Sequence, residues 1–253
     1  NLYVLSCHVQ ILCFTTKGKV FWLKVYEIPV ASRTSKGRPL VNMLNLDEDE
    51  RVSEILPVEE FSDNKYIFMA TRKGITKKTK LSLFERKWKS GIKAINLDED
   101  DKLIGSAITN GDNEILLASS AGKLIRFNES KVRPMGRTAR GVRGIKLKKG
   151  HKLISLNIAD SSKTVFCVSE NGYGKKTKLN DFPIHNRGGQ GVISIKTSER
   201  NGLMVAAALV EENDGIMLIS DKGTMIRTNV SQVPTLSRNT QGVKEITPKE
   251  GEK

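Results

Sequence analysis

The stretch YIFMATRKGITKKTKL (Tyr66–Leu81) decides the fold class, because a short apolar run leads into a polar turn at Gly74 and then into a second run that carries basic residues. Strand, glycine turn and strand is the sequence pattern of a β-hairpin. The pattern occurs five times, and its turn glycines recur at intervals of 48 to 56 residues. The other copies are ILCFTTKGKVFWLKV (Ile11–Val25), EILLASSAGKLIRF (Glu114–Phe127), TVFCVSENGYGKKTKL (Thr164–Leu179) and GIMLISDKGTMIRT (Gly215–Thr228).

A second glycine follows each turn glycine after 17 to 19 residues and leads from a polar or basic loop into another expected strand. A fourth apolar stretch (RVSEIL, KLIGSAI, KLISLNI, GLMVAAALV) closes each of the first four repeats. Four short strands in a unit of about 50 residues are typical of a propeller blade. We therefore predict an all-β, propeller-like fold of four-stranded blades in a single domain over residues 1–253. Its five repeats lie near 11–56, 66–108, 114–158, 164–210 and 215–247, and its second glycines are Gly37, Gly91, Gly141, Gly191 and Gly242.

Two other folds stay open at this stage. Two unrelated β-domains would need ten glycines to fall into register by chance. An open solenoid would stack the same repeats without closing a ring.

The composition favours a partner that carries negative charge. The chain has 42 Lys and Arg against 28 Asp and Glu, a net charge of +14. Nucleic acid is the first candidate, and an anionic membrane surface is the second. Membrane binding needs an amphipathic helix with a basic face, and the sequence shows none. The longest apolar run, Leu203–Val210, has the length of a strand, and the N-terminus does not resemble a signal peptide. Since the chain begins with Asn1, we expect a fragment of a longer protein.

Basic residues recur at one position of the repeat, in the second hairpin strand and the loop after it. In a closed radial repeat, one position in the unit forms one ring, so we expect a basic band that binds a polyanion. Acidic runs such as Asp47–Glu50 and Asp98–Asp101 precede the closing strand and should form a separate zone. The candidate phosphate contacts are Arg33, Lys36, Arg38, Lys77, Lys78, Lys80, Arg86, Lys87, Lys89, Arg126, Arg137, Arg140, Arg143, Lys175, Lys176, Lys178, Arg187, Arg227 and Arg238.

Duplex DNA fits such a band better than single strands do. A curved basic rim can hold a continuous line of phosphates by bending it, and these contacts position the duplex without identifying bases. We therefore expect weak sequence preference and strong salt dependence. Single-strand binding needs exposed aromatic residues that recur along the groove, but aromatics make up only 6% of the chain and form no such series.

The sequence predicts no catalytic, metal or cofactor site. His8, His151 and His185 fall at unrelated positions of the repeat, and no common catalytic or phosphate-loop motif occurs. The run Asp98–Asp101 does not have the spacing of a calcium loop. Cys13 and Cys167 lie in apolar strands and are predicted to be core residues. The absence of a disulfide framework fits a reducing compartment.

Several segments resemble the C-terminal domain of the bacterial DNA gyrase A protein, and the resemblance covers nearly the whole chain. It is closer to gyrase than to the related topoisomerase IV protein. The segments are EIPVASRTSKGRPLVNML (Glu27–Leu44), KVRPMGRTARGVRGIKL (Lys131–Leu147), ENGYGKKTKL (Glu170–Leu179), GVISIKTSERNGLMV (Gly191–Val205) and SRNTQGV (Ser237–Val243).

This resemblance implies a six-bladed β-pinwheel whose blades exchange strands and whose basic rim wraps duplex DNA in a positive sense. It implies a monomeric, non-catalytic domain that supports negative supercoiling by an A2B2 holoenzyme in the bacterial cytoplasm, associated with the nucleoid. The catalytic tyrosine would lie in the N-terminal part of the gyrase A protein. ATP and Mg would be used by other domains, with the ATPase in the gyrase B subunit.

One departure affects the expected wrap. The family's wrapping motif, QRRGGKG, should lie upstream of residue 1, and only Arg187–Gly191 (RGGQG) resembles it, in the fourth repeat. We therefore expect the first of six blades to be missing or incomplete, DNA binding to persist and full wrapping to be impaired. Two other functions remain open: a topoisomerase IV counterpart without a strong chiral wrap, and a propeller that binds acidic protein partners.

Overall fold

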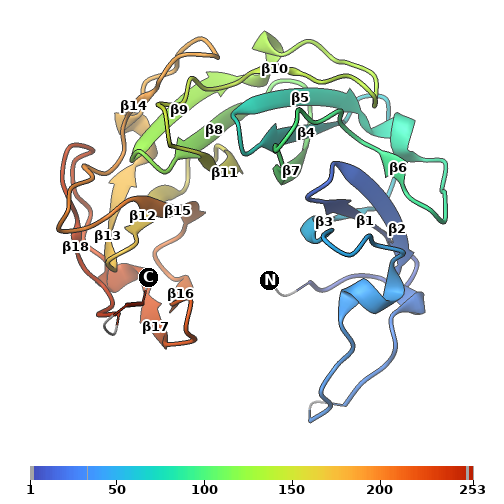
Figure 1. The fold of residues 1–253 in the computed structure, drawn as a ribbon, viewed down its shortest axis with the longest axis horizontal. Coiled ribbons are helices and arrows are strands. Elements are labelled where there is room, and N and C mark those ends of the chain that lie inside the picture. The colour runs from blue at the N-terminus through green and yellow to red at the C-terminus, as the bar shows by residue number, and fades with distance from the viewer. Residues whose placement is uncertain (1–2, 33, 249–250, 253) are drawn as a thin grey trace. The chain divides into compact units, whose positions relative to one another are not determined.

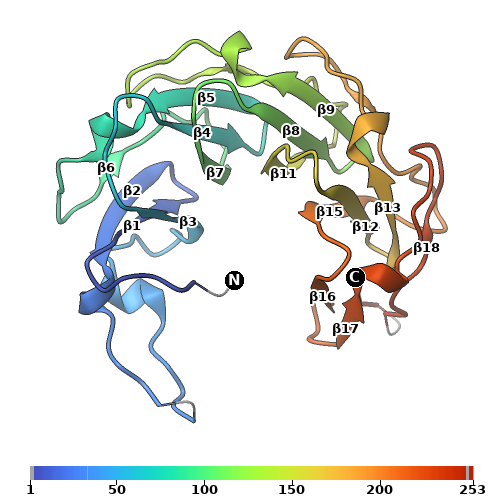
Figure 2. The ribbon, with the colours of Figure 1, turned by 180° about the vertical axis from the view of Figure 1, so that it is seen from behind.

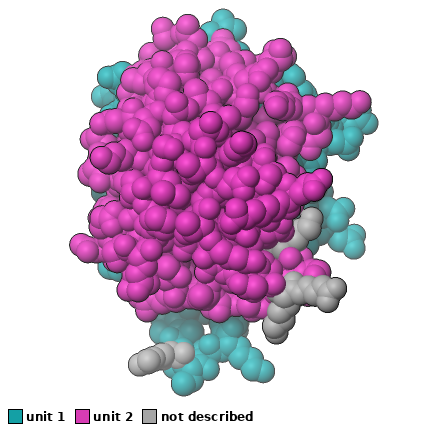
Figure 3. Space-filling model, turned by 90° about the vertical axis from the view of Figure 1, so that its left-hand side faces the viewer, with its two compact units in different colours: residues 1–112, 132–142 teal, residues 113–131, 143–253 magenta. Residues whose placement is uncertain are grey.

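The computed structural model describes residues 3–32, 34–248 and 251–252. These residues form strands, short 3-10 helices and loops, and no described helix is long and apolar enough to cross a membrane. They divide into two compact units, residues 1–112 with 132–142 and residues 113–131 with 143–253, which Figure 3 colours separately.

The first unit contains two antiparallel sheets with the orders β3-β1-β2-β6 and β10-β5-β4-β7 (Figure 1). Val142, the first residue of β10, belongs to this unit. The strands are β1 (Gln10–Thr15), β2 (Lys19–Lys24), β3 (Val52–Val58), β4 (Tyr66–Thr71), β5 (Ile75–Lys80), β6 (Ile92–Lys93), β7 (Leu103–Thr109) and β10 (Val142–Arg143).

The second unit contains two further four-stranded sheets, β11-β8-β9-β14 and β15-β12-β13-β18, and the two-stranded sheet β16-β17 (Figure 1 and Figure 2). The strands are β8 (Glu114–Ser119), β9 (Lys123–Asn128), β11 (Leu153–Ile158), β12 (Thr164–Ser169), β13 (Tyr173–Lys178), β14 (Val192–Ile193), β15 (Met204–Val210), β16 (Gly215–Ile219), β17 (Met225–Asn229) and β18 (Val243–Lys244).

The fourth strand of each four-stranded sheet comes from the following repeat. β6 pairs with β2, β14 with β9 and β18 with β13. The bonds are centred on the turn glycines: the N–H groups of Ala94, Ser194 and Glu245 donate to the carbonyls of Gly18, Gly122 and Gly172 at 2.7, 2.8 and 2.8 Å. The all-β, propeller-like prediction is confirmed, and so is the strand exchange that the resemblance implies. The strand after Gly91, Gly141, Gly191 or Gly242 therefore completes the preceding blade and not its own.

The first repeat departs from the predicted pattern. After Gly37 the chain forms a 3-10 helix, η2 (Leu40–Met43), where a strand was expected. In the later repeats this segment becomes a strand only by pairing with the sheet of the repeat before it. Within the described residues no earlier repeat offers the first one such an edge, so the segment stays outside any sheet.

Apolar strands form the cores between consecutive sheets of each unit. In the first unit, Leu12 and Phe14 of β1 pack with Ile67 and Met69 of β4. In the second unit, the corresponding core contains Leu116, Val165 and Met204, and Phe166 packs with Leu218 in another. The central strands β1, β4, β8 and β12 are covered on both faces, so they are continuous apolar runs in the sequence.

Cys13 and Cys167 are buried, as predicted. Burial raises the pKa of Cys13 to about 12 and that of Cys167 to about 11. Both thiols therefore stay protonated at neutral pH and pack as small apolar groups.

A short 3-10 helix follows the second hairpin strand of every repeat. Each helix turns the chain from the sheet into the loop where the basic residues cluster. The helices are η1 (Val25–Glu27), η3 (Leu81–Phe84), η4 (Glu129–Lys131), η5 (Leu179–Asp181) and η6 (Val230–Gln232).

Candidate nucleic-acid interface

We call the segment between each 3-10 helix and the second glycine of the repeat its basic loop: residues 28–37, 85–91, 132–141, 182–191 and 233–242. The last three basic loops run parallel to the second hairpin strand of the preceding repeat, through bridges between Pro134 and Lys78, Ile184 and Arg126, and Thr235 and Lys176. The N–H groups of Met135, His185 and Leu236 each donate to that strand at 2.8 Å. The main chain thus fixes these loops beside the preceding sheet.

More than half of the predicted phosphate contacts are exposed, and most of these lie on or beside the basic loops. Four more are partly buried: Arg126, Arg137, Arg187 and Arg238. Arg33 lies outside the described residues. The exposed residues are Lys36, Arg38, Lys80, Arg86, Lys87, Lys89, Arg140, Arg143, Lys178 and Arg227.

Four predicted contacts are buried and have partners within the protein. The Nζ of Lys176 bonds both carboxylate oxygens of Glu212 at 2.7 and 2.8 Å, and the Nζ of Lys78 lies 5.0 Å from the centre of the Tyr66 ring. Lys77 and Lys175 bind main-chain carbonyls. These amino groups do not reach the surface, so we leave them out of the proposed contact surface.

Arg126 also forms structural contacts. Its guanidinium bonds Glu114 at 2.5 and 2.6 Å and donates to the carbonyls of Leu179 and Phe182 at 3.1 Å, and its side chain is only 12% exposed. This arginine therefore ties β9 to η5 of the following repeat. Arg187 acts similarly, because it donates to the carbonyls of Lys131 and Arg143 at 2.8 and 3.1 Å.

The expected separation of acidic and basic zones is not kept around Arg140. Its guanidinium forms two bonds of 2.5 Å with Asp98, which hold the pKa of that carboxyl below its usual range. The cause is the strand exchange: the N–H of Asn96, just before the acidic turn, donates to Ala139 of the next basic loop at 3.1 Å. A phosphate at Arg140 would compete with Asp98.

Trp88 is a surface feature that sequence reasoning missed. The indole is 46% exposed on the second basic loop, and the guanidinium of Arg86 lies 4.8 Å from its ring centre. The low aromatic content and the lack of a recurring series gave no reason to single it out. The signal that could have found it is a tryptophan between basic residues, in RKWK (Arg86–Lys89).

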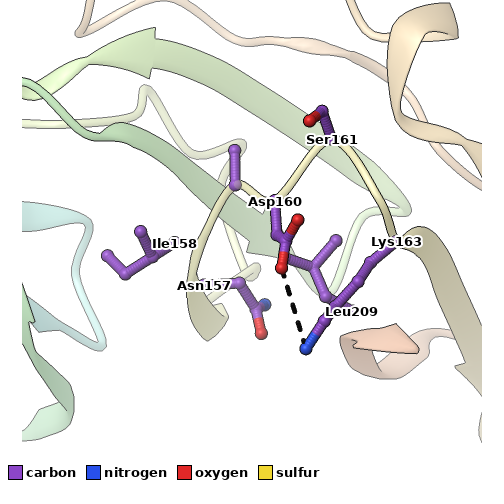
Figure 4. Close-up of a pocket in the computed structure, with 7 residues that line it drawn as sticks. Asn157, Ile158, Asp160, Ser161, Lys163 and Leu209 are labelled. Atoms are coloured by element: carbon purple, nitrogen blue, oxygen red, sulfur yellow. Dashed lines mark ion pairs between the residues drawn. The ribbon is translucent and has the colours of Figure 1, made fainter. Parts of the chain in front are cut away.

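The described residues offer no catalytic constellation. They contain no cluster of three or more metal-binding side chains. A hollow of about 560 Å³ lies between the β11–β12 turn and β15 (Figure 4). Its carboxylate and amide groups have partners: Asp160 accepts two bonds from Ser162, which lower its pKa, and lies 3.8 Å from Lys163, while Asn157 donates to Ala207. Asp160 is thereby stabilised as a carboxylate within its own turn.

Arg126→Met is expected to destabilise the protein by about 2 kcal/mol, because it leaves Glu114 and two carbonyls without their donor. The matched control is Arg227→Met. Arg227 occupies the same position of the fifth repeat but is exposed, so its loss should change stability by less than about 0.5 kcal/mol. Urea unfolding of both variants measures the difference in the free energy of unfolding. Equal losses of stability in the two variants would contradict the structural role of Arg126.

Comparison with known proteins finds the family model described as the DNA gyrase C-terminal domain, beta-propeller. It matches residues 10–59, 65–110, 113–160, 163–211 and 216–253. The DNA gyrase A protein of Salmonella typhimurium is 49% identical over 243 residues, and that of Escherichia coli K12 is 47% identical over 243 residues. Each alignment covers 96% of this chain but only 28% of the relative, so the chain spans less than a third of these proteins.

Two solved structures share the fold over almost the whole chain. The C-terminal domain of DNA topoisomerase IV superimposes with a TM-score of 0.89 and 27% sequence identity. The match covers 97% of this chain and 77% of the topoisomerase IV chain. The DNA gyrase A C-terminal domain superimposes with a TM-score of 0.82 and 25% sequence identity. The match covers 98% of this chain and 81% of the gyrase A domain's chain. The fold is closely shared with both, and the sequence is far more similar to the gyrase A proteins of Salmonella typhimurium and Escherichia coli.

Proposed function

Because this chain belongs to the DNA gyrase C-terminal domain family, we propose that it binds duplex DNA along its basic loops and wraps it without regard to sequence. The observation that carries the proposal is the repeated placement of the basic loop beside the second hairpin strand of the preceding repeat. A repeated placement gives a series of cationic sites, and a duplex presents a matching series of phosphates. The exposed arginines and lysines of the loops are the contacts.

The exposed residues explain why this surface should hold the backbone of DNA and not its bases. Arg86, Arg143 and Arg227 carry permanent charge at the surface. Phosphate contacts position a duplex, and bending a segment of tens of base pairs costs several kcal/mol, so several repeats must contribute. Tight binding should therefore need contacts from consecutive loops.

The wider setting follows from the relatives. We propose that residues 1–253 act as one DNA-wrapping domain of a gyrase A protein, which joins gyrase B in an A2B2 holoenzyme in the bacterial cytoplasm, at the nucleoid. ATP and Mg would be used by other domains, and this domain would add no catalytic group. Wrapping would present a second DNA segment to the strand-passage site and so support negative supercoiling.

A salt-titrated mobility shift on a duplex of about 40 base pairs tests the binding. We expect the logarithm of affinity to fall steeply and linearly with the logarithm of salt concentration, because each neutralised phosphate contributes about 0.9 to the slope. Absence of binding at low salt would refute the proposal and favour an acidic protein partner. Ligation of a nicked circle with bound protein tests the wrap, through a positive shift in linking number. Binding without that shift would correspond to the topoisomerase IV counterpart.

A further inference from the structure

Lys77 is a fully buried lysine beneath a basic loop. Its Nζ donates to the carbonyls of Ala94 at 2.6 Å and Gly136 at 2.8 Å, and also to the carbonyl of Arg137. Three carbonyl acceptors around one amino group match the three donors of an ammonium ion. Two of these carbonyls belong to the loop 132–141, so the lysine binds this loop from below.

Lys175 repeats the arrangement two repeats later. It is also fully buried, and its Nζ donates to the carbonyls of Ser237 at 2.6 Å and Arg238 at 2.7 Å, in the loop 233–242. Each lysine is the third residue after its turn glycine, Gly74 or Gly172. The same two positions of two basic loops are therefore held by the same chemical group.

Apolar residues take this position in the first and third repeats. Phe21 is the third residue after Gly18, and its ring comes within 2.7 Å of the place that a Cβ on Gly91 would take. Ile125 is the third residue after Gly122 and lies below Gly189. Loops 85–91 and 182–191 thus rest on apolar side chains, while loops 132–141 and 233–242 rest on amino groups. A strand does not need a buried lysine here, which points to a role in the loop above it.

We propose that Lys77 and Lys175 are positioning residues of the DNA interface, which turn carbonyls of the basic loops inward and thereby hold Arg137, Arg140 and Arg238 in place for phosphate. This inference rests on the proposed function. A preorganised loop avoids the entropic cost of ordering arginines when DNA binds.

The buried amino groups also link DNA binding to protons. Burial, assisted by the guanidinium of Arg137, lowers the pKa of Lys77 to about 7. Burial lowers the pKa of Lys175 to about 8; the Cys167 thiol opposes this and Arg238 adds to it. Phosphates at the loops would favour the ammonium forms and raise both pKa values. The DNA-bound protein would then hold more protons. Affinity should therefore fall as pH rises above about 7 for Lys77 and above about 8 for Lys175, by up to about tenfold per pH unit for each lysine.

The test is calorimetric titration of the whole chain with duplex DNA at pH 8, in two buffers of different ionisation enthalpy. We expect wild-type protein to take up a measurable fraction of a proton, and Lys77→Met and Lys175→Met each to reduce that uptake and weaken binding about tenfold. Ile226→Met is the matched control at the same position of the fifth repeat, where the side chain is exposed, and it should change neither quantity.

Hydrogen exchange without DNA provides a second readout. Amides 135–140 should exchange faster in Lys77→Met than in wild type, and amides 235–241 faster in Lys175→Met. Variants that keep wild-type affinity, proton uptake and loop exchange would overturn the proposal, even if their stability falls. If wild-type protein binds no DNA, the proposed function fails, and the exchange data alone decide whether the lysines order the loops.

Discussion

Gly141→Val is expected to destabilise the protein by at least about 3 kcal/mol and lower its Tm by roughly 6 to 12 °C. Gly141 has a φ of +98°, a conformation that a β-branched residue adopts only with strain. A Cβ at this position would also lie 2.4 Å from the carbonyl oxygen of Thr76, a main-chain atom that cannot move without distorting β5. Val142, the next residue, accepts a bond from the Thr76 hydroxyl, so the exchanged strand would be displaced as well.

The matched control is Gly136→Ala in the same loop. Gly136 does not have a positive φ, and a Cβ on it would meet no atom within 4 Å. Its carbonyl, which Lys77 binds, is unchanged by the substitution. We expect a change within about 0.5 kcal/mol, measured by differential scanning calorimetry. A Gly141→Val protein that melts at the wild-type temperature would show that this glycine is not needed for the strand exchange.

Replacing Arg137, Arg140 and Arg143 together by Gln is expected to reduce the salt slope of DNA binding by up to about 2.7 and to weaken binding roughly a hundredfold near 0.1 M salt. The reason is the loss of up to three phosphate contacts, each of which contributes about 0.9 to the slope. Because Arg140 is paired with Asp98, its replacement also leaves an uncompensated carboxylate beside the loop, which adds repulsion. Mobility shifts at five or more salt concentrations measure the slope.

A control with the same change in charge separates contact from net charge. Lys148, Lys149 and Lys152 are exposed in the turn before β11, at another position of the repeat. Their joint replacement by Gln should leave the slope nearly unchanged. An unchanged salt slope in the arginine variant, or equal losses of slope in both variants, would show that DNA does not bind at the basic loops.

The hairpins and closing strands were predictable because each depends on residues that are near in sequence. The runs before Gly74 and Gly172 are apolar because those strands are covered, and the turn glycine after each of them fixes the hairpin. Strand exchange was not predictable from periodicity. The two-residue strands β6, β14 and β18 carry almost no pattern, and only the family resemblance assigned them to a neighbouring blade.

The candidate site was predicted less well, for a physical reason. A lysine in a surface-like run such as ITKKTK is expected to be solvated, but the burial of Lys77 depends on a loop about 60 residues further along the chain. The sequence gives the charge of a residue and its position in the repeat. It does not show whether a later repeat will cover that residue with carbonyl groups.

Strand exchange also sets the order in which the protein can mature on the ribosome. The sheet of each repeat stays incomplete until the second half of the next repeat has emerged, since β6 closes the sheet of β2 and β18 closes that of β13. A nascent chain would therefore have one incomplete sheet at a time. As synthesis proceeds, the incomplete sheet would be that of each successive repeat, from the N-terminal one onward. Because the second to fifth repeats each lend an equivalent strand to the sheet before them, excision of one whole inner repeat should leave its neighbours able to pair, whereas a cut inside a repeat should leave two sheets incomplete.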